Sequence, residues 1–526
     1  MKKISVLLLL LGFGFLYSFL LNRTPIHLNQ DELGFSLNAY SIAKTGFDEN
    51  GRFFPLYFWH LGVMWAAPFI VYLTALFLLV FPLSEIVVRL PSVLVAVCNI
   101  LLIYVVGRKI FKSHLWGLAS AVLLGLTPAH FIHGRILLDT LYIVPFALGW
   151  LLLLIYFLEK KNQWILFAIG VVLGIGIHSY HAAKIMIPIY LLLTLVFAYP
   201  YIKGKKSYLL LLIGFVLPLV PLVPWLALYP DTLLDQVRYT GLYDTKLNPF
   251  SGIATLLTPE IIFHKISVFI SYFDPFFLFL LGDASLIHST SLRHPLGISQ
   301  SIVRAGVFLF PFAVFLPIGI FWIVKIGKNR FFWLFITGFF TAPVAAALVG
   351  DHYRISRSLA MLPFAALIAV CAIRFLVSQK VKLLRALCYL LLIVIPLQFS
   401  YFVYDYFTDY RIRSYNWMRY NIPGALEEII LQEKKVPAKV IYIDRRTEFI
   451  DRYWKFYLIK HNEEELFEKT VFFEPRDIVI EDLENNSIIM YNMNDVDGLK
   501  TEVGPFKKVA SIFEPDGVSV FYIYRN

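Results

Sequence analysis

Long apolar runs separated by short polar segments dominate the first 402 residues of the chain. A helix that crosses a membrane needs about 20 predominantly apolar residues, and runs near that length recur throughout this part of the sequence. They cover residues 4–21, 86–106, 115–128, 138–158, 164–177, 185–201, 208–228, 303–324, 331–349, 359–377 and 383–402. The pattern predicts a polytopic α-helical membrane bundle of about eleven to thirteen spans.

Two further apolar stretches contain prolines and call for a different interpretation. The stretch 65–81 contains Pro68, which favours an interfacial or re-entrant helix. The stretch 261–281 is interrupted at Pro275, so we expect helices at the membrane surface there and not a span.

The sequence pattern changes after residue 402. An aromatic and charged connector leads to residue 420, and short alternating apolar runs typical of strands follow it. The predicted strands are 440–443, 470–473, 487–491, 509–512 and 519–524, and the predicted helices are 426–433 and 463–469. We therefore expect a transmembrane domain over residues 1–420 and a small soluble α/β domain over residues 421–526.

Positive charge is distributed unevenly between the predicted loops. The chain has 47 Lys and Arg residues against 36 Asp and Glu, a net charge of +11, and the cations gather in alternate loops. These loops contain Lys2/Lys3, Arg108/Lys109/Lys112, Lys160/Lys161, Lys203/Lys205/Lys206, Lys325/Lys328/Arg330 and Arg374/Lys380/Lys382/Arg385. Because such loops remain cytoplasmic, we predict a multi-pass protein of the cell membrane with a cytoplasmic N-terminus and an extracytoplasmic C-terminal domain.

The composition narrows the classes of function. The chain is 59% hydrophobic and 16% charged, whereas soluble domains average roughly 45–50% and about 25%. Membrane orientation accounts for the excess of cations, so nucleic acid is not an expected partner. The three cysteines all lie in apolar runs, which supports neither a disulfide framework nor a zinc site. The first apolar run lacks a following small-residue cleavage site, so we expect a retained helix and not a signal peptide.

The other set of loops contains most residues with catalytic potential. Asp31 and Glu32 come directly after the first predicted span. A carboxylate in a partly dry site can act as a general base. The alternative is that Asp31 only caps the helix that the pattern predicts from Leu33.

A second polar cluster follows the third predicted span. Arg135 and Asp139 are four residues apart, so on a continuing helix they would share a face and pair. Charges at membrane depth otherwise face a cavity. His130 and His133 leave a divalent metal open as an alternative, although two histidines alone are weak evidence for a metal site.

Three later segments of the same loops add polar side chains. They contain Tyr180 and Lys184; Asp283, Arg293 and His294; and His352, Arg354 and Arg357. Their cations run against the positive-inside tendency, and arginine binds phosphate through two parallel hydrogen bonds. We therefore expect an anion to bind at this face.

Several motifs occur in a specific order along residues 1–420. They are Asp31-Glu32 with Tyr40, Ala43 and Gly46; residues 85–92 with Tyr104, Gly107-Arg108 and Phe111; residues 128–135 with Asp139; Tyr180 with Lys184 and Pro188; Gly282-Asp283 with Arg293-His294; and His352 with Arg354, Arg357 and Pro363. In this order and spacing the sequence resembles the GT-C membrane glycosyltransferases. The closest branch looks like the bacterial relatives of protein O-mannosyltransferases (dolichyl-phosphate-mannose-protein mannosyltransferases) and lipid A aminoarabinose transferases.

The resemblance implies a GT-C-like bundle that moves a sugar from a polyprenyl-phosphate-linked donor to an acceptor on the outer face of the membrane. The acceptor would be a protein, a lipid or a cell-envelope glycan. The reaction would be one inverting displacement, with Asp31 as general base and Glu32 and Asp139 as further catalytic residues. The implied substrate-binding residues are His133, Arg135, Tyr180, Lys184, Asp283, Arg293, His294, His352, Arg354 and Arg357.

The first loop departs from the family pattern. Many relatives carry an acidic residue or histidine and a lysine before a proline pair, whereas residues 63–68 here read Val-Met-Trp-Ala-Ala-Pro. A metal or phosphate contact at that place is therefore not carried over, and His60 or the later arginines are candidates to replace it. Two other classes stay open: a transporter or flippase of a lipid-linked intermediate, and a non-catalytic membrane receptor. Clean spans without internal repeats speak against the transporter.

Overall fold

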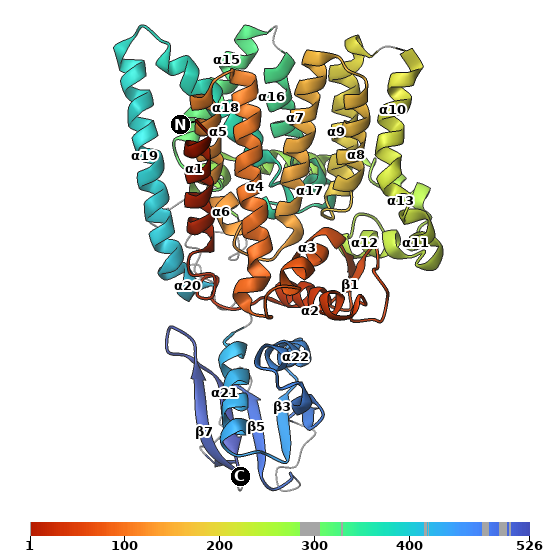
Figure 1. The fold of residues 1–526 in the computed structure, drawn as a ribbon, viewed down its shortest axis with the longest axis vertical. Coiled ribbons are helices and arrows are strands. Elements are labelled where there is room, and N and C mark those ends of the chain that lie inside the picture. The colour runs from red at the N-terminus through yellow and green to blue at the C-terminus, as the bar shows by residue number, and fades with distance from the viewer. Residues whose placement is uncertain are drawn as a thin grey trace.

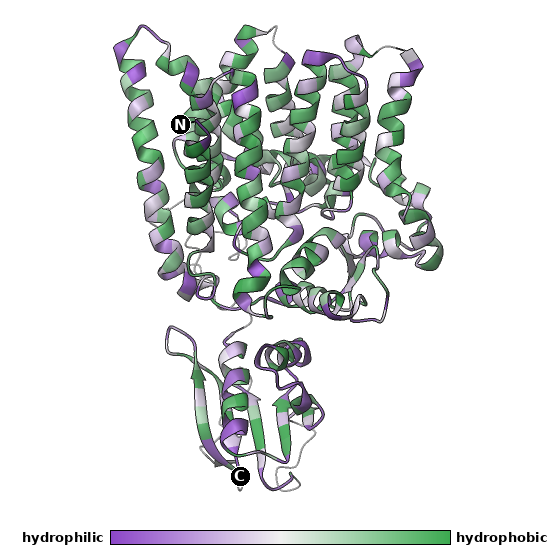
Figure 2. Cartoon of the chain, in the orientation of Figure 1, coloured by the Kyte–Doolittle hydropathy of each residue, from purple (hydrophilic) through white to green (hydrophobic). Residues whose placement is uncertain are grey.

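The computed structural model describes residues 2–202, 204–283, 306–327, 330–414, 418, 420–475, 483–493, 502–503 and 506–526. Most of the chain before residue 414 is helical, and its longer helices lie side by side in a bundle (Figure 1). Apolar residues cover these helices, whereas polar residues concentrate at the helix ends and in the C-terminal part (Figure 2). The chain is therefore a multi-pass α-helical membrane protein.

Each predicted apolar run overlaps at least one helix of the bundle. These helices are α1 (Lys2–Ser18), α4 (Glu85–Phe111), α5 (His114–Gly125), α7 (Val144–Lys160), α8 (Trp164–Gly176), α9 (Ala183–Ala198), α10 (Gly204–Val216), α15 (Phe312–Ile326), α16 (Arg330–Thr341), α18 (Met361–Val377) and α19 (Lys382–Phe407). Within the described residues, five segments are long and apolar enough to cross a membrane, and two bent helix pairs raise this to seven. The count of about eleven to thirteen spans stays a prediction.

The predicted C-terminal end of the span at 115–128 is wrong. Helix α5 stops at Gly125, and a new short helix, α6 (Pro128–His133), begins at Pro128, because proline fits the first turn of a helix and not its interior. The 3₁₀ helix η1 (Asp139–Ile143) follows before α7. Arg135 and Asp139 therefore lie on no common helix, and the predicted pairing along a helical face is wrong.

Short elements cover the end of the bundle nearest the C-terminal sheet (Figure 1). They are α2 (Gln30–Thr45), β1 (Phe58–His60), β2 (Met64–Ala66), α3 (Pro68–Leu78) and α12 (Thr232–Thr240). The helix predicted at 65–81 is shorter than expected, because the segment begins in β2, which pairs with β1 in antiparallel orientation. The break predicted near Pro275 is confirmed, since α14 (Pro259–Ser271) ends before it.

The C-terminal part contains a sheet of six described strands in the order β4-β3-β5-β8-β7-β6. The strands are β3 (Val440–Asp444), β4 (Thr470–Phe473), β5 (Ser487–Asn492), β6 (Glu502–Val503), β7 (Phe506–Phe513) and β8 (Ser519–Arg525). Strand β3 pairs in parallel with β4 and β5, and the other pairs are antiparallel. All five predicted strands are present, and β6 was not predicted.

Two helices accompany this sheet. The predicted helix at 426–433 is confirmed as α21 (Ile422–Lys435), whereas the segment 463–469 forms only a short 3₁₀ turn, Glu464–Phe467. Helix α22 (Ile450–His461) was not predicted, and it packs against α2. The C-terminal part thus touches the elements that cover the end of the bundle.

Candidate active site

Two buried arginines fix the chain segment between α1 and α2. Arg89 of α4 donates hydrogen bonds of 2.7, 2.9 and 2.7 Å to three carbonyl oxygens of this segment. Arg135 donates to the carbonyl oxygens of Tyr17 and Thr24 at 2.6 and 2.8 Å. Because buried carbonyl groups need such donors, the two guanidinium groups hold the path of the chain into α2.

Glu32 completes this arrangement from within α2. Its carboxylate accepts hydrogen bonds from Arg89 Nε (2.8 Å) and from the backbone N–H groups of Leu137 and Asn29 (both 3.1 Å). The Asn29 side chain in turn accepts from the Glu32 N–H and caps the helix. The expectation that Asp31 caps this helix is therefore wrong. Glu32 itself stabilises the fold here, since its side chain is fully buried and both of its oxygens accept hydrogen bonds from protein groups.

Asp31, the neighbouring carboxylate, is accessible. Its side chain is 42% exposed, and Oδ1 accepts a hydrogen bond of 3.0 Å from Nε2 of His60, the last residue of β1. The His60 ring is buried and stacks on Phe35, with centroids 4.4 Å apart. This ring lies so close to α2 that a Cβ atom at Gly34 would come within 2.7 Å of its Cε1. Glycine at position 34 therefore permits the histidine position that orients Asp31.

A second carboxylate, Asp139, lies within electrostatic reach of Asp31. The charges of Arg357 and Lys184 act on the same carboxylate. Its Oδ2 is 4.0 Å from Nε2 of His181. Residues from α2, η1, the start of α9 and the segment before α18 therefore meet in one polar cluster at this end of the bundle.

His181 contributes a neutral imidazole to the cluster. Burial lowers the pKa of His181 well below its ordinary value, and the positive charges of Lys184 and Arg357 lower it further. Its contact with Asp139 is therefore not an ion pair. Within the described part of the chain, Nε2 of His181 has no hydrogen-bond partner, which leaves this nitrogen available to a substrate group.

The segment after α17 (Val344–Val349) supplies two cations. Arg357, at the end of η5 (Ile355–Arg357), pairs with Asp351 at 3.0 Å between Nε and Oδ2. Arg354 pairs with the same carboxylate at 3.6 Å, and its side chain is 50% exposed. One carboxylate neutralises only one of the two charges, so this segment keeps a net positive charge.

Two predicted substrate-binding residues hold the same segment in place. The Tyr180 hydroxyl donates to the carbonyl oxygen of Ser356 at 3.3 Å, and Asp283 accepts a hydrogen bond of 2.5 Å from the Ile355 N–H. Burial raises the pKa of Tyr180 to about 12, so this phenol stays protonated as a donor. Both residues therefore position the Arg354–Arg357 segment.

Lys184 has few protein contacts. It lies in the first turn of α9, and its Nζ is 5.2 Å from the centroid of the Tyr57 ring. The Tyr57 hydroxyl in turn lies 2.9 Å from Nδ1 of His178. Among the described residues, the Lys184 ammonium group makes no hydrogen bond or ion pair. An ammonium group without a paired carboxylate is suited to bind an anionic ligand.

The predicted histidine ligands do not converge on a metal site. His130 lies 2.8 Å from the Tyr17 hydroxyl, whereas His133 lies 3.0 Å from the Thr140 hydroxyl. Both rings are fully buried among protein groups. The described residues contain no group of three or more His, Cys, Asp or Glu side chains arranged to hold a metal.

The remaining predicted binding residues have different surroundings. Arg135 is buried and bound to backbone carbonyls, so it supports the first loop and is not placed for a ligand. His352 lies against the ring of His264, with centroids 5.7 Å apart. Arg293 and His294 lie outside the described residues.

Sequence reasoning missed three members of the cluster. His181 and Asp351 lie inside the polar segments that the sequence indicated, but spacing along the chain does not reveal what they contact. No sequence motif pointed to Tyr239 of α12. Its pKa is raised mainly by partial burial and secondly by the negative charge of Asp31, which places its hydroxyl near the cluster. His60 was named only as a replacement for a missing motif, and it proves to be the hydrogen-bond partner of Asp31.

Part of the sequence matches a known protein family. Residues 66–225 match the dolichyl-phosphate-mannose-protein mannosyltransferases, a stretch that includes Asp139, Tyr180 and Lys184. No curated protein sequence matches the chain significantly.

Solved structures match over a much longer part of the chain. The crystal structure of ArnT from Cupriavidus metallidurans in the apo state has a TM-score of 0.52 at 12% identity, over 99% of this chain and 98% of that one. The form bound to undecaprenyl phosphate has a TM-score of 0.51 at 11% identity, over 99% and 97%. The archaeal oligosaccharyltransferase AglB from Archaeoglobus fulgidus, in complex with an inhibitory peptide and a dolichol-phosphate, has a TM-score of 0.46 at 12% identity, over 91% and 65%. The chain therefore shares the fold of ArnT, and residues 66–225 are similar to the dolichyl-phosphate-mannose-protein mannosyltransferases.

Proposed function

We propose that the chain is an inverting glycosyltransferase that moves a sugar from a polyprenyl-phosphate donor to an acceptor on the outer face of the membrane. One observation carries this proposal: an exposed, histidine-bound carboxylate, Asp31, shares a polar cluster with the cations Lys184 and Arg357. A base and cations within one polar cluster suit an attack on a sugar with a phosphate leaving group. The ArnT structure with the same fold binds undecaprenyl phosphate, which supports a lipid-phosphate donor.

In this mechanism Asp31 takes the proton from the acceptor nucleophile. His60 holds the Asp31 carboxylate through its Nε2 hydrogen bond and leaves the second oxygen free to accept that proton. The nucleophile attacks the anomeric carbon from the face opposite the phosphate, and the bond between this carbon and the phosphate oxygen breaks. The polyprenyl phosphate leaves as an anion, so a general acid is less needed.

The cations act on the leaving group. Lys184 and Arg357 stabilise the charge that develops on the phosphate. Arg354, whose side chain is half-exposed, binds the phosphate before the reaction. The charge of Asp139 interacts with those of Asp31, Arg357 and Lys184, and in this mechanism it attracts and positions Lys184. Tyr180 and Asp283 keep the arginine segment in place.

We propose that residues 1–420 form the catalytic domain and residues 421–526 an extracytoplasmic α/β domain. The alternation of loop charge supports this orientation. The transferred group is a hexose or pentose.

Replacement of Asp31 tests the function. In membranes supplied with a radiolabelled polyprenyl-phosphate sugar, Asp31→Asn should lower transfer by roughly 100-fold to 10,000-fold, because amide nitrogen and oxygen cannot take the proton. The matched control is Asp244→Asn, which changes an exposed carboxylate outside the cluster and should transfer normally. Full transfer by Asp31→Asn would remove Asp31 as the base.

A further inference from the structure

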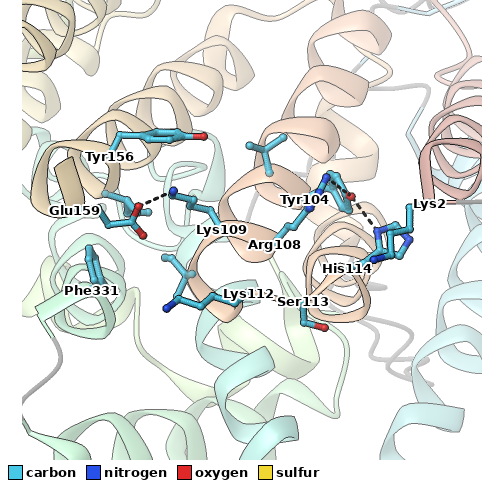
Figure 3. A pocket seen from close by; sticks show the side chains of 13 residues that line it. Lys2, Tyr104, Arg108, Lys109, Lys112, Ser113, His114, Tyr156, Glu159 and Phe331 are labelled. Atoms are coloured by element: carbon cyan, nitrogen blue, oxygen red, sulfur yellow. Dashed lines mark hydrogen bonds and ion pairs between the residues drawn. The ribbon is translucent and has the colours of Figure 1, made fainter.

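A second polar cavity lies at the opposite end of the bundle from the candidate active site. It has a volume of about 1020 Å³ and is lined by residues of α1, α4, α5, α7 and α16 (Figure 3). Helix α4 connects the two ends: Glu85, at its start, contacts the C-terminal part, and Lys109, near its end, lines the cavity. A helix of this length spans about 40 Å, so this cavity and the Asp31 cluster are separate sites.

Cations dominate the polar lining of the cavity. Lys2, Arg108, Lys109 and Lys112 line it together with one carboxylate, Glu159. Glu159 pairs with Lys109 at 2.5 Å, and the Lys109 ammonium also lies 4.4 Å from the centroid of the Tyr156 ring. Within the described part of the chain, no carboxylate pairs with the other three cations. Their charges are therefore left for solvent or for a ligand.

Hydrogen bonds give the cavity a defined polar wall. The His114 ring lies between the hydroxyl groups of Tyr104 and Ser5, at 2.9 Å from each. Arg108 donates from Nη1 to the same Tyr104 hydroxyl at 3.5 Å, which leaves its other N–H groups unengaged by described residues (Figure 3). The guanidinium group is thus anchored at one edge, with donors left for an anion.

The apolar part of the lining indicates the kind of anion. Val105, Ile110, Ile155 and Phe331 line the cavity beside the cations. A cavity at helix ends that combines cations with apolar walls fits a phosphate group joined to acyl chains. Membrane orientation alone requires cations in loops, but it does not require cations from separate helices to share one cavity. We propose that this cavity binds the phosphate group of an anionic ligand, with an anionic phospholipid as the first candidate.

The test compares two double variants of the full-length chain. Arg108→Gln with Lys112→Gln removes two cations that line the cavity. Lys205→Gln with Lys206→Gln removes two exposed cations of α10 that are not among the lining residues. Both double variants lose two positive charges from the basic side of the bundle. Any effect of charge on membrane orientation is therefore the same in both. Unfolding midpoints in detergent establish that each variant is folded.

Binding is measured in two arms. Native mass spectrometry follows retained phosphatidylglycerol against phosphatidylcholine, and thermal unfolding follows stabilisation by inorganic phosphate. We expect the cavity variant to bind phosphatidylglycerol roughly tenfold or more weakly, because each cation near a membrane surface contributes measurably to attraction of an anionic lipid. The α10 variant should bind as the unmodified chain does.

The two arms distinguish the sources of phosphate. Loss confined to the lipid arm identifies a phospholipid site, and loss of stabilisation by inorganic phosphate identifies a site for a soluble phosphate compound. Equal binding by both variants in both arms would overturn the proposal. Asp31→Asn should bind phosphatidylglycerol normally, so failure of this inference and failure of the proposed transferase activity are separable.

Discussion

Two adjacent carboxylates, Asp31 and Glu32, have different tasks because they occupy different positions in the first turn of α2. Glu32 lies on the buried side, where Arg89 and two backbone N–H groups bind its oxygens. Asp31 keeps 42% of its side chain exposed and contacts His60. One residue of displacement along the helix therefore separates the structural acid from the proposed base.

Replacement of Glu32 should lower the stability of the fold, in addition to any effect on sugar transfer. Glu32→Gln leaves Arg89 as a buried charge without its carboxylate, and removal of one partner of a buried ion pair costs about 3–5 kcal/mol. We expect a clearly lower unfolding midpoint in detergent for Glu32→Gln and an unchanged midpoint for Asp31→Asn. A Glu32→Gln chain that unfolds normally but transfers no sugar would instead make Glu32 a direct participant in the reaction.

His181 should make the fold sensitive to acid. Burial keeps the pKa of His181 well below its ordinary value of 6.5, so the folded ring stays neutral where the unfolded ring takes up a proton. Stability is therefore complete above pH 6.5 and falls as the pH drops below it, by about 1.4 kcal/mol at one pH unit lower. His181→Gln should lose less stability between pH 7.5 and 5.5 than the unmodified chain.

The matched control for this pH dependence is His264→Gln, which removes an exposed histidine of α14. Its loss of stability on acidification should equal that of the unmodified chain. Equal acid sensitivity of His181→Gln and His264→Gln would mean that the His181 ring is protonated, or readily hydrated, in the folded state.

At the scale of elements, the distance between α2 and β1 determines how Asp31 is held. A Cβ atom at Gly34 would lie 2.7 Å from Cε1 and 2.9 Å from Nδ1 of His60, well inside van der Waals contact. The buried ring cannot move away without leaving Phe35, on which it stacks. The close approach of helix and strand is therefore a condition for the Asp31–His60 hydrogen bond.

Gly34→Ala should displace His60 and lower transfer roughly tenfold to 100-fold, as small displacements of catalytic groups do. The control is Gly12→Ala in α1, where an added Cβ meets no atom within 4 Å. Because alanine favours a helix more than glycine does, the control should be as stable as the unmodified chain or slightly more stable, and fully active. Normal transfer by Gly34→Ala would show that the His60 position is not needed.

Some elements could be predicted from the sequence and others could not, for physical reasons. Apolar runs of membrane length predicted the bundle helices, and alternation of apolar residues predicted the strands β3, β4, β5, β7 and β8. Helix α22 was missed because its sequence mixes aromatic and charged residues, Asp451 to His461, and its buried face is defined only by contact with α2. Pro128 was included in a span because the apolar run continues to it, although the helix stops at Gly125.

The candidate site, too, was predictable in part. The polar segments at one face were identified from their position after apolar runs, and Asp31 and Lys184 were among them. The Asp31–His60 hydrogen bond and the interactions of Asp139 with His181 and Arg357 join parts of the chain that are far apart in sequence. Periodicity carries no information about such interactions. The resemblance to a family supplied roles for residues, but it could not show that Arg135 binds backbone carbonyls.

At the scale of the whole molecule, the C-terminal part contacts the segment that leads to the proposed base. Tyr453 of α22 donates to the carbonyl oxygen of Leu28 at 2.9 Å, just before α2 begins. Lys460 pairs with Glu85 at 2.8 Å and with Glu427 at 2.7 Å. Burial alone would lower the pKa of Lys460, but these two carboxylates outweigh it and raise that pKa. The C-terminal part is therefore linked by charge to the start of α4 and by a hydrogen bond to the first loop.

Removal of the Glu85 charge should loosen this link. Glu85 also accepts a hydrogen bond of 3.0 Å from Tyr457, so Glu85→Gln weakens two contacts of α22. A partly exposed ion pair contributes up to about 1 kcal/mol, and its loss should raise amide hydrogen exchange in α22 about fivefold. Glu484→Gln is the control, because its exposed ion pair with Lys439 lies within the C-terminal part and, among the described residues, involves no bundle helix. Because α22 also holds Leu28, the Glu85 variant should transfer sugar more slowly, whereas unchanged exchange and unchanged transfer would show that the C-terminal part does not support the site.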